Sequence, residues 1–193
     1  NIEALIDGAV WSNPSLTFGF TDSGSYYGPG DGTAEIAAAM SSLNAVQRAG
    51  TRTILTQYSN LSNLAFTELT VNPGNADLRY ALSNEPDTAH AYMPGPGDGG
   101  DSWYNTTGYV SPSVGNYDWV AFIHETGHAL GLKHGHESPA LSADRDSLEF
   151  SVMTYRGYIG APTDEENGGY TNETFGFPQT PMMYDIAALQ RLY

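Results

Sequence analysis

The chain carries its most informative stretch at Phe122-Ile123-His124-Glu125-Thr126-Gly127-His128-Ala129-Leu130-Gly131-Leu132-Lys133-His134. Read as a helix, this stretch places His124 and His128 one turn apart on the same face, where two imidazoles can share one metal ion. Gly131 is the residue expected where the helix ends, because glycine adopts the left-handed backbone conformation without steric cost. The chain can then turn back and bring His134 to the same ion as a third nitrogen ligand.

Three neutral histidines with an open fourth position are the ligand set of a catalytic zinc ion. Glu125 cannot easily reach the metal while its two neighbours face it, but it can reach a water held there, so we expect it to act as a general base. The shorter pattern His-Glu-x-x-His recurs by chance and in unrelated zinc hydrolases, whereas the extended pattern is far more specific. The alternative is a surface helix that happens to be rich in histidine, with Glu125 as a structural surface residue.

The extended motif is similar to the metzincin signature, and a second element of that group lies 19 residues after His134. Ser151-Val152-Met153-Thr154-Tyr155 resembles the Met-turn, which passes beneath the metal as an apolar floor. A tyrosine two residues after the methionine is similar to serralysins and astacins. Further stretches resemble the serralysin catalytic domain, so that the resemblance covers nearly the whole chain: Leu16-Thr17-Phe18-Gly19-Phe20, Phe66-Thr67-Glu68-Leu69, Asp101-Ser102-Trp103-Tyr104-Asn105 and Asp185-Ile186-Ala187-Ala188-Leu189-Gln190.

This resemblance implies a secreted, bacterial, zinc-dependent endopeptidase that hydrolyses peptide bonds in proteins. It implies catalytic zinc on His124, His128 and His134, with Tyr155 as an additional ligand. In serralysins the hydroxyl of that tyrosine can swing away from the metal and help stabilise the oxyanion; the alternative is a tyrosine of the core beside the turn. Residues 155–159 are expected to form a wall of the pocket for the residue after the scissile bond.

The implied fold is the α+β metzincin (zincin-like) fold. Its parts are a twisted, mostly parallel sheet with an antiparallel edge strand, a long backing helix, the active-site helix and a mostly irregular C-terminal subdomain with a final helix. We expect residues 1–193 to form a single metalloprotease catalytic domain, with an N-terminal subdomain over 1–134 and a C-terminal subdomain with the Met-turn over 135–193.

Hydrophobic periodicity predicts strands over residues 16–20, 64–71 and 76–83. It also predicts a helix that opens at residues 33–35, runs to 46, is interrupted at Gly50 and resumes at 54–61. The resemblance to serralysins offers the alternative of one long helix with an N-terminal extension. Residues 89–93 are expected to be an edge strand beside the active site, where a substrate peptide can extend the sheet. We expect His90 to be a sheet or surface residue rather than a ligand, and Pro181 to be an early residue of the final helix.

Composition narrows the possible partners. The chain has 22 acidic and 7 basic residues and a formal net charge of −15, so nucleic acid and anionic membrane surfaces should repel it. The negative charge contributes only to solubility or, alternatively, makes the protein prefer cationic substrates. The absence of cysteine excludes disulfides, and no run reaches the roughly 20 apolar residues of a membrane span.

We expect a monomer that binds protein or peptide substrates and a proteinaceous inhibitor. The start lacks the features of a signal peptide, so a mature or trimmed N-terminus is expected.

Some alternatives stay open. Residues 97–101, Gly-Asp-Gly-Gly-Asp, suit a Ca²⁺-binding turn or a plain turn, and the calcium-binding repeats usual in serralysins do not occur in these 193 residues. Gly135 stands where many serralysins have proline, and we expect His136 to lie at the rim of the cleft. Residues 164–169 are expected to form an acidic, glycine-rich loop.

An astacin-like or other metzincin protease is one competing hypothesis for the function, which the missing cysteines and Gly135 disfavour. A non-catalytic binding scaffold stabilised by zinc is the other.

Overall fold

The structure is a computed structural model, and it describes residues 2–163 and 170–193. A five-stranded sheet has the order β2-β1-β3-β5-β4. All neighbouring pairs are parallel except β4 with β5, which is antiparallel. The bounds of the strands are β1 Ser15–Phe20, β2 Ala65–Glu68, β3 Leu78–Ser83, β4 Ala89–Ala91 and β5 Asp101–Asn105. The predicted mostly parallel sheet with an antiparallel edge strand is therefore confirmed, as are its three predicted strands, although β2 is shorter than expected.

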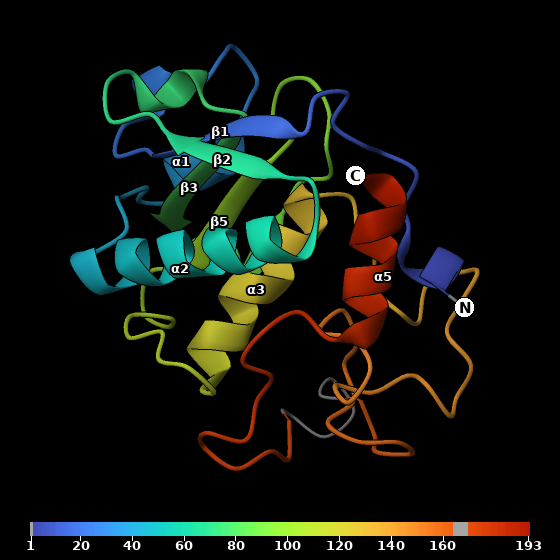
Figure 1. Cartoon of the computed structure of the whole chain (residues 1–193). Coiled ribbons are helices and arrows are strands. Elements are labelled where there is room, and N and C mark those ends of the chain that lie inside the picture. The colour runs from blue at the N-terminus through green and yellow to red at the C-terminus, as the bar shows by residue number, and fades with distance from the viewer. Residues whose placement is uncertain (1, 164–169) are drawn as a thin grey trace.

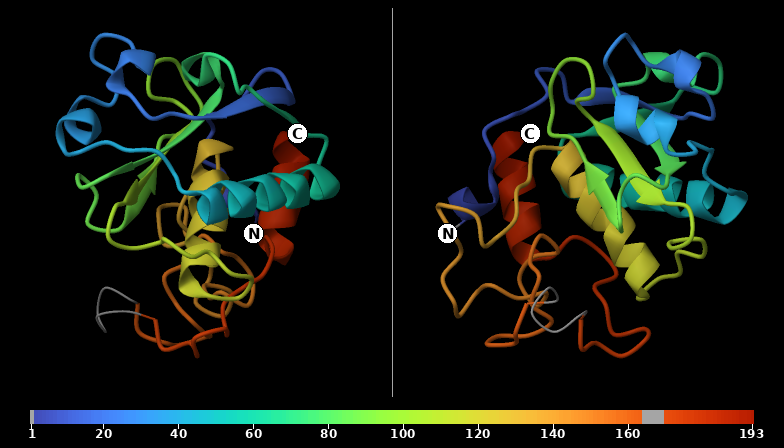
Figure 2. Two further views of the ribbon diagram at one scale, coloured as in Figure 1. Left: turned by 90° about the vertical axis from the view of Figure 1, so that its left-hand side faces the viewer. Right: turned by 180° about the vertical axis from the view of Figure 1, so that it is seen from behind.

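Helices cover both faces of this sheet. The short α1, Thr33–Ala37, lies on one face, while the long α2, Ala45–Leu61, and α3, Tyr117–Ala129, lie on the other (Figure 1; Figure 2). Every residue of the central strand β3 is buried, as expected for a parallel strand packed on both sides. Short 3₁₀ helices lie before β1 at Ile2–Leu5 and in two connections, at Gly24–Tyr26 and Pro73–Asn75.

The predicted helix over residues 33–46 is wrong, because the chain breaks between α1 and α2. Ala39 has a positive φ of 60°, and Ser41 forms an antiparallel bridge to Leu82 that draws this segment onto the sheet. Asn44 then starts α2 with a capping box, its side chain accepting from the N–H of Val46 and Gln47.

The predicted interruption at Gly50 is also wrong, since Gly50 lies inside α2. A Cβ at this position would lie 3.2 Å from the ring of Pro112 and 3.7 Å from Trp119. Gly50 is therefore explained by the close approach of a neighbouring segment rather than by the end of a helix.

The described chain after His134 is mostly irregular until the final helix α5, Met183–Leu192 (Figure 1). Pro181 lies before the N-cap Met182 and so outside the helix, contrary to expectation. Residues 97–100 form a turn in which the carboxylate of Asp98 accepts from the N–H of Gly32 at 2.7 Å, and Asp101 begins β5. The loop expected over 164–169 lies outside the described residues, and the division of the chain at residue 134 stays a prediction. Among the described residues, no helix has the length and apolar character needed to cross a membrane.

Candidate metal centre

The helix α3 is positioned at both ends by local interactions. Asn116 caps its start, because its side-chain oxygen accepts from the N–H of Trp119 at 2.8 Å. In the middle, the buried hydroxyl of Tyr58 on α2 donates to the carbonyl of Ile123 at 2.8 Å. The helix ends at Ala129 with Leu130 as its C-cap, and Gly131 follows with a φ of +98°, as the sequence predicts.

Gly131 sends the chain back along the N-terminal segment. A Cβ at this position would lie 2.4 Å from the carbonyl oxygen of Ala9, so a larger residue does not fit. Leu132 then pairs with Ile6 as an antiparallel bridge, and the N–H of Lys133 donates to the carbonyl of Leu5 at 2.8 Å. This pairing fixes the return path that carries His134 to the face of α3.

Three histidine side chains converge at this point. The Nε2 atoms of His124 and His128 are 3.0 Å apart, and they lie 3.2 and 3.0 Å from Nε2 of His134. Nitrogens about 2.0–2.1 Å from a tetrahedral zinc ion are about 3.3 Å from one another. The three nitrogens therefore have nearly the spacing of three corners around zinc.

The hydrogen-bond partners of the Nδ1 atoms indicate which nitrogen of each histidine ring carries the proton. Nδ1 of His124 lies 2.7 Å from the carbonyl oxygen of Val152, and Nδ1 of His128 lies 2.7 Å from that of Leu132. Nδ1 of His134 lies 2.9 Å from Oε1 of Glu137. Because these oxygens only accept, each Nδ1 donates and each neutral ring presents a bare lone pair at Nε2. Three lone pairs that face one another repel unless a cation lies between them, so this donor set fits zinc.

Burial keeps two of these rings neutral. Burial, and then the neighbouring His134, lower the pKa of His124 to about 3, and burial lowers the pKa of His128 well below its usual value. Neutral imidazole is the form that binds a metal ion.

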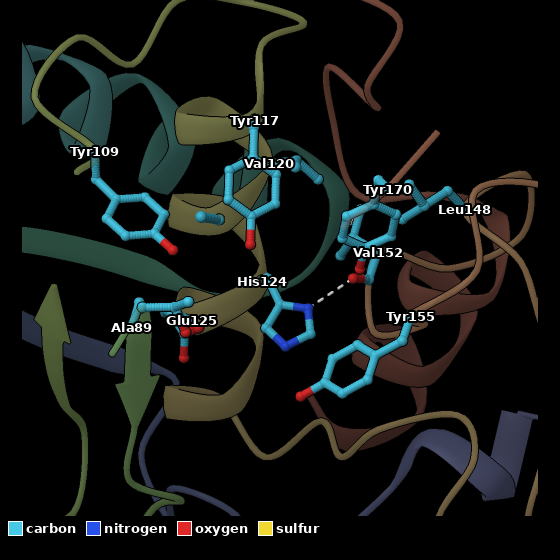
Figure 3. A pocket seen from close by; sticks show the side chains of 12 residues that line it. Ala89, Tyr109, Tyr117, Val120, His124, Glu125, Leu148, Val152, Tyr155 and Tyr170 are labelled. Carbon is cyan, nitrogen blue, oxygen red and sulfur yellow. Dashed lines mark hydrogen bonds between the residues drawn. The ribbon is translucent and has the colours of Figure 1, made fainter. Parts of the chain in front are cut away.

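Two further side chains, those of Glu125 and Tyr155, lie beside His124 (Figure 3) and line the same hollow as all three histidines, where the sequence predicts them. Glu125 is 7% exposed, and burial raises its pKa to about 8, a value suited to a group that exchanges protons near neutral pH. The hydroxyl of Tyr155 lies 3.0 Å from Nε2 of His134. Both side chains therefore line the space beside the three histidines.

The segment that carries Tyr155 also forms the floor. Met153 is fully buried, and a Cβ at Gly127 of α3 would lie 2.8 Å from its sulfur. Asp185 of α5 holds this turn, accepting from the hydroxyl of Ser151 at 2.6 Å and from the N–H of Val152 at 2.9 Å. An apolar floor thus lies against the helix beside His128.

Two hollows open on the centre, and Ala89, His124, Glu125 and Tyr155 line both. The edge hollow, about 250 Å³, lies along β4 and is also lined by His90, Ala91 and Glu137. The tyrosine cavity, also about 250 Å³, is lined further by Tyr109, Tyr117, Val120, Leu148, Val152 and Tyr170 (Figure 3). Of the wall expected over residues 155–159, only Tyr155 lines it; Tyr158 and Ile159 are exposed instead.

His90 and His136 lie outside the centre, as the sequence predicts. His90 belongs to β4, and its Nε2 lies 3.0 Å from the buried carboxylate of Glu35. His136 is exposed at the rim, with its ring nearly parallel to that of His134 at 5.1 Å.

Sequence reasoning missed Glu137 and the roles of Asp185 and Val152. Glu137 is three residues from a predicted ligand, and this spacing was a usable signal. Asp185 lies 34 residues from Ser151 and Val152 contributes a backbone carbonyl, so no local pattern points to either.

Comparisons with known proteins agree with this geometry. The family model Peptidase_M10, described as matrixin, matches residues 33–145, which is more than half of the chain. Serralysin C of Dickeya chrysanthemi is 35% identical over 93% of this chain and 38% of its own length. Metallopeptidase AprA of Pseudomonas marginalis is 31% identical over 79% of this chain and 35% of its own length, and a serralysin of Proteus mirabilis is 31% identical over 78% and 35%.

The chain thus spans less than two fifths of the length of these curated relatives. The predicted resemblance to serralysins and the predicted zinc cofactor are confirmed. The chain belongs to the matrixin family of zinc metalloproteases, as a domain of the serralysin type.

Proposed function

We propose that the chain is the catalytic domain of a secreted bacterial endopeptidase that hydrolyses peptide bonds in proteins. The observation that carries this proposal is the convergence of three Nε2 atoms beside the buried carboxyl group of Glu125, at the mouth of two hollows. A purely structural zinc site has no use for a carboxyl group held beside an open position.

We assign zinc binding to His124, His128 and His134, with Tyr155 as an additional ligand. When bound there, zinc lowers the pKa of water from about 15.7 toward about 7 and polarises a carbonyl group. Glu125 accepts a proton from the attacking water and passes it to the leaving amine. The hydroxyl of Tyr155, within reach of the same site, donates a hydrogen bond to the oxyanion as it forms.

The substrate backbone adds to the sheet at β4. The backbone groups of Thr88 and Tyr92 bond to β5, so those of Ala89 and Ala91 point the other way by strand alternation, toward the edge hollow. An extended peptide can pair with these groups and pass its scissile bond over the centre. Protein and peptide substrates follow from this arrangement. We further propose that the chain acts as a monomer and has no nucleic-acid or membrane partner.

The test is cleavage of casein and of a quenched peptide library, with and without a zinc chelator, together with metal analysis. We expect one zinc ion per chain, cleavage that chelation abolishes, and recovery on addition of zinc. Glu125→Gln should bind zinc equally and lose about 10²- to 10⁴-fold in kcat. Equal turnover by this variant contradicts the mechanism. One zinc ion without any cleavage supports the binding scaffold instead.

A further inference from the structure

We propose that Glu35 is a positioning residue for the substrate, because its buried carboxylate fixes the edge strand β4 where the substrate backbone pairs with it. This inference rests on the proposed function, since it concerns the strand that receives the substrate. Glu35 belongs to α1, which lies on the face of the sheet opposite α3 (Figure 1). It does not line the edge hollow, so it acts on a substrate only through β4.

One carboxylate oxygen of Glu35 contacts two side chains of the edge strand. Oε1 accepts from the hydroxyl of Tyr92 at 2.7 Å and lies 3.0 Å from Nε2 of His90. Because an ionised carboxylate only accepts, Nε2 of His90 donates the second bond. His90 and Tyr92 are two residues apart and therefore leave the strand on the same face. A single oxygen thus ties this face of the edge strand to α1.

The carboxylate of Glu35 is ionised although it is buried. Glu35 is 2% exposed, and burial acts to raise its pKa. The hydrogen bonds from Tyr92, from its own backbone N–H and from His90 outweigh burial and hold the pKa below its ordinary value. Hydrogen bonds to an ionised group are about twice as strong as those between neutral groups. The two bonds to the strand are therefore strong ones.

The backbone of Glu35 is attached to the centre of the sheet. The hydroxyl of Ser83, the last residue of the central strand β3, donates to the carbonyl of Glu35 at 2.7 Å. Ser83 is itself fully buried. Glu35 therefore joins the edge strand to the middle of the sheet by a path that does not pass through β5.

The strand that Glu35 holds is short. β4 has three residues, all half-buried, and it pairs with β5 on one side. Its other side offers backbone groups to a substrate, and a peptide aligned there is productive only if the strand keeps its place relative to the zinc-binding histidines. The two bonds from Glu35 supply that fixed position.

The experiment uses quenched peptides that share one central sequence. A short peptide has two residues on each side of the scissile bond, and extended peptides carry three further alanines at one end or at the other. In the wild-type protein, extension at the end that pairs with β4 should lower KM. In Glu35→Ala, KM for that extended peptide should rise about tenfold and kcat should stay within about twofold, because ground-state and transition-state binding weaken equally. Both constants for the short peptide should change less than about twofold.

Matched variants separate the carboxylate from a loss of charge or of folding. Glu35→Gln keeps an oxygen that accepts both bonds, so KM should return to within about threefold of the wild type. Tyr92→Phe removes one donor and keeps the ring, so it should raise KM about threefold and add little to Glu35→Ala. Asp87→Asn removes an exposed acid two residues before β4 and should change nothing. If circular dichroism shows that Glu35→Ala does not fold, Tyr92→Phe replaces it.

Hydrogen exchange tests the strand without any substrate. The N–H of Tyr92 donates to the carbonyl of Asp101 at 2.9 Å, at the end of the pairing between β4 and β5. In Glu35→Ala the amides of residues 89–92 should exchange about tenfold faster, while those of β3 should exchange as in the wild type. Equal exchange at residues 89–92 overturns the proposal.

Binding keeps this inference separate from catalysis. The peptides are titrated by calorimetry into zinc-loaded Glu125→Gln, alone and combined with Glu35→Ala. If the wild-type protein cleaves no peptide but the double variant binds the extended peptide about tenfold more weakly, the proposal for Glu35 stands and the endopeptidase proposal fails. Equal affinity of the two variants for that peptide overturns the proposal for Glu35 whatever the activity. The same rise in KM for short and extended peptides also overturns it, because such a rise indicates a general structural role.

Discussion

His134 donates the proton of its Nδ1 to the carboxylate of Glu137 over 2.9 Å, whereas His124 and His128 donate to backbone carbonyls. The backbone of Glu137 is itself held, because the buried Lys133 donates from Nζ to its carbonyl at 2.9 Å. A carboxylate partner orients an imidazole and raises its basicity more than a neutral carbonyl does. The third proposed zinc ligand is therefore supported differently from the other two.

We predict that Glu137→Gln lowers zinc affinity by about tenfold, because the loss of an outer partner typically costs 10- to 100-fold. The amide can still accept a hydrogen bond, so the fold and the ring orientation should survive. Competition with a chromophoric chelator measures the affinity. Glu173→Gln, at an exposed glutamate, is the control. An affinity equal to that of the wild type would show that the contact with His134 adds nothing.

A second prediction concerns Asp185, which connects α5 to the floor of the centre. Its carboxylate accepts from Ser151, Val152 and the N–H of Met182, the last at 2.8 Å. Asp185→Ala leaves these donors without a partner in the core and should lower the free energy of unfolding by roughly 3 kcal/mol. Urea denaturation measures this change, with the exposed Asp22→Ala as a control.

The same variant should also weaken zinc binding. Val152 donates to Asp185 with its N–H and accepts from His124 with its carbonyl, so one short segment joins the carboxylate to a proposed zinc ligand. We expect a loss of about tenfold in zinc affinity. A variant that is destabilised but binds zinc normally would confine Asp185 to a role in folding.

Gly127 gives a third prediction, about packing between α3 and Met153. A methyl group here would lie 2.8 Å from the sulfur of Met153 and 3.3 Å from the hydroxyl of Tyr58. Overpacking of this kind costs about 1–3 kcal/mol, which exceeds the gain of about 1 kcal/mol from alanine in a helix. Gly127→Ala should therefore be destabilised in urea, while Gly108→Ala, with open space around it, should not. If Gly127→Ala were more stable than the wild type, the side chain of Met153 would have to move aside without cost, and the prediction would be wrong.

The sequence predicts the three histidines of the centre better than the groups that hold their rings in place. His124, His128 and His134 are found together because a helical turn and one glycine determine where they lie. The partners of these rings come from two backbone carbonyls and one side chain, and a carbonyl has no signature in a sequence. Only Glu137 could have been identified in advance.

In the fold, too, features set by the local sequence pattern are predictable, whereas features set by contacts distant in sequence are not. The strands follow from alternation and burial, and the mostly parallel sheet follows from the family resemblance. The break between α1 and α2 does not, because Ser41 leaves the helical path to pair with Leu82, 41 residues away. Tyr170 likewise reaches the tyrosine cavity through contacts with Thr154, Phe177 and Tyr117 that no periodicity encodes.

The last prediction separates the two roles proposed for Tyr155. If its hydroxyl stabilises the oxyanion, Tyr155→Phe should lower kcat by about 10- to 100-fold, somewhat less than the loss of a principal oxyanion donor, and leave KM nearly unchanged. Zinc affinity should fall little, because three histidines remain. The ring stays in place, 4.7 Å from that of His134, so the pocket keeps its shape. Steady-state kinetics and chelator competition on one preparation measure both quantities. A tyrosine that served only the core would leave kcat intact, and one that mainly held the metal would reduce zinc affinity as much as turnover.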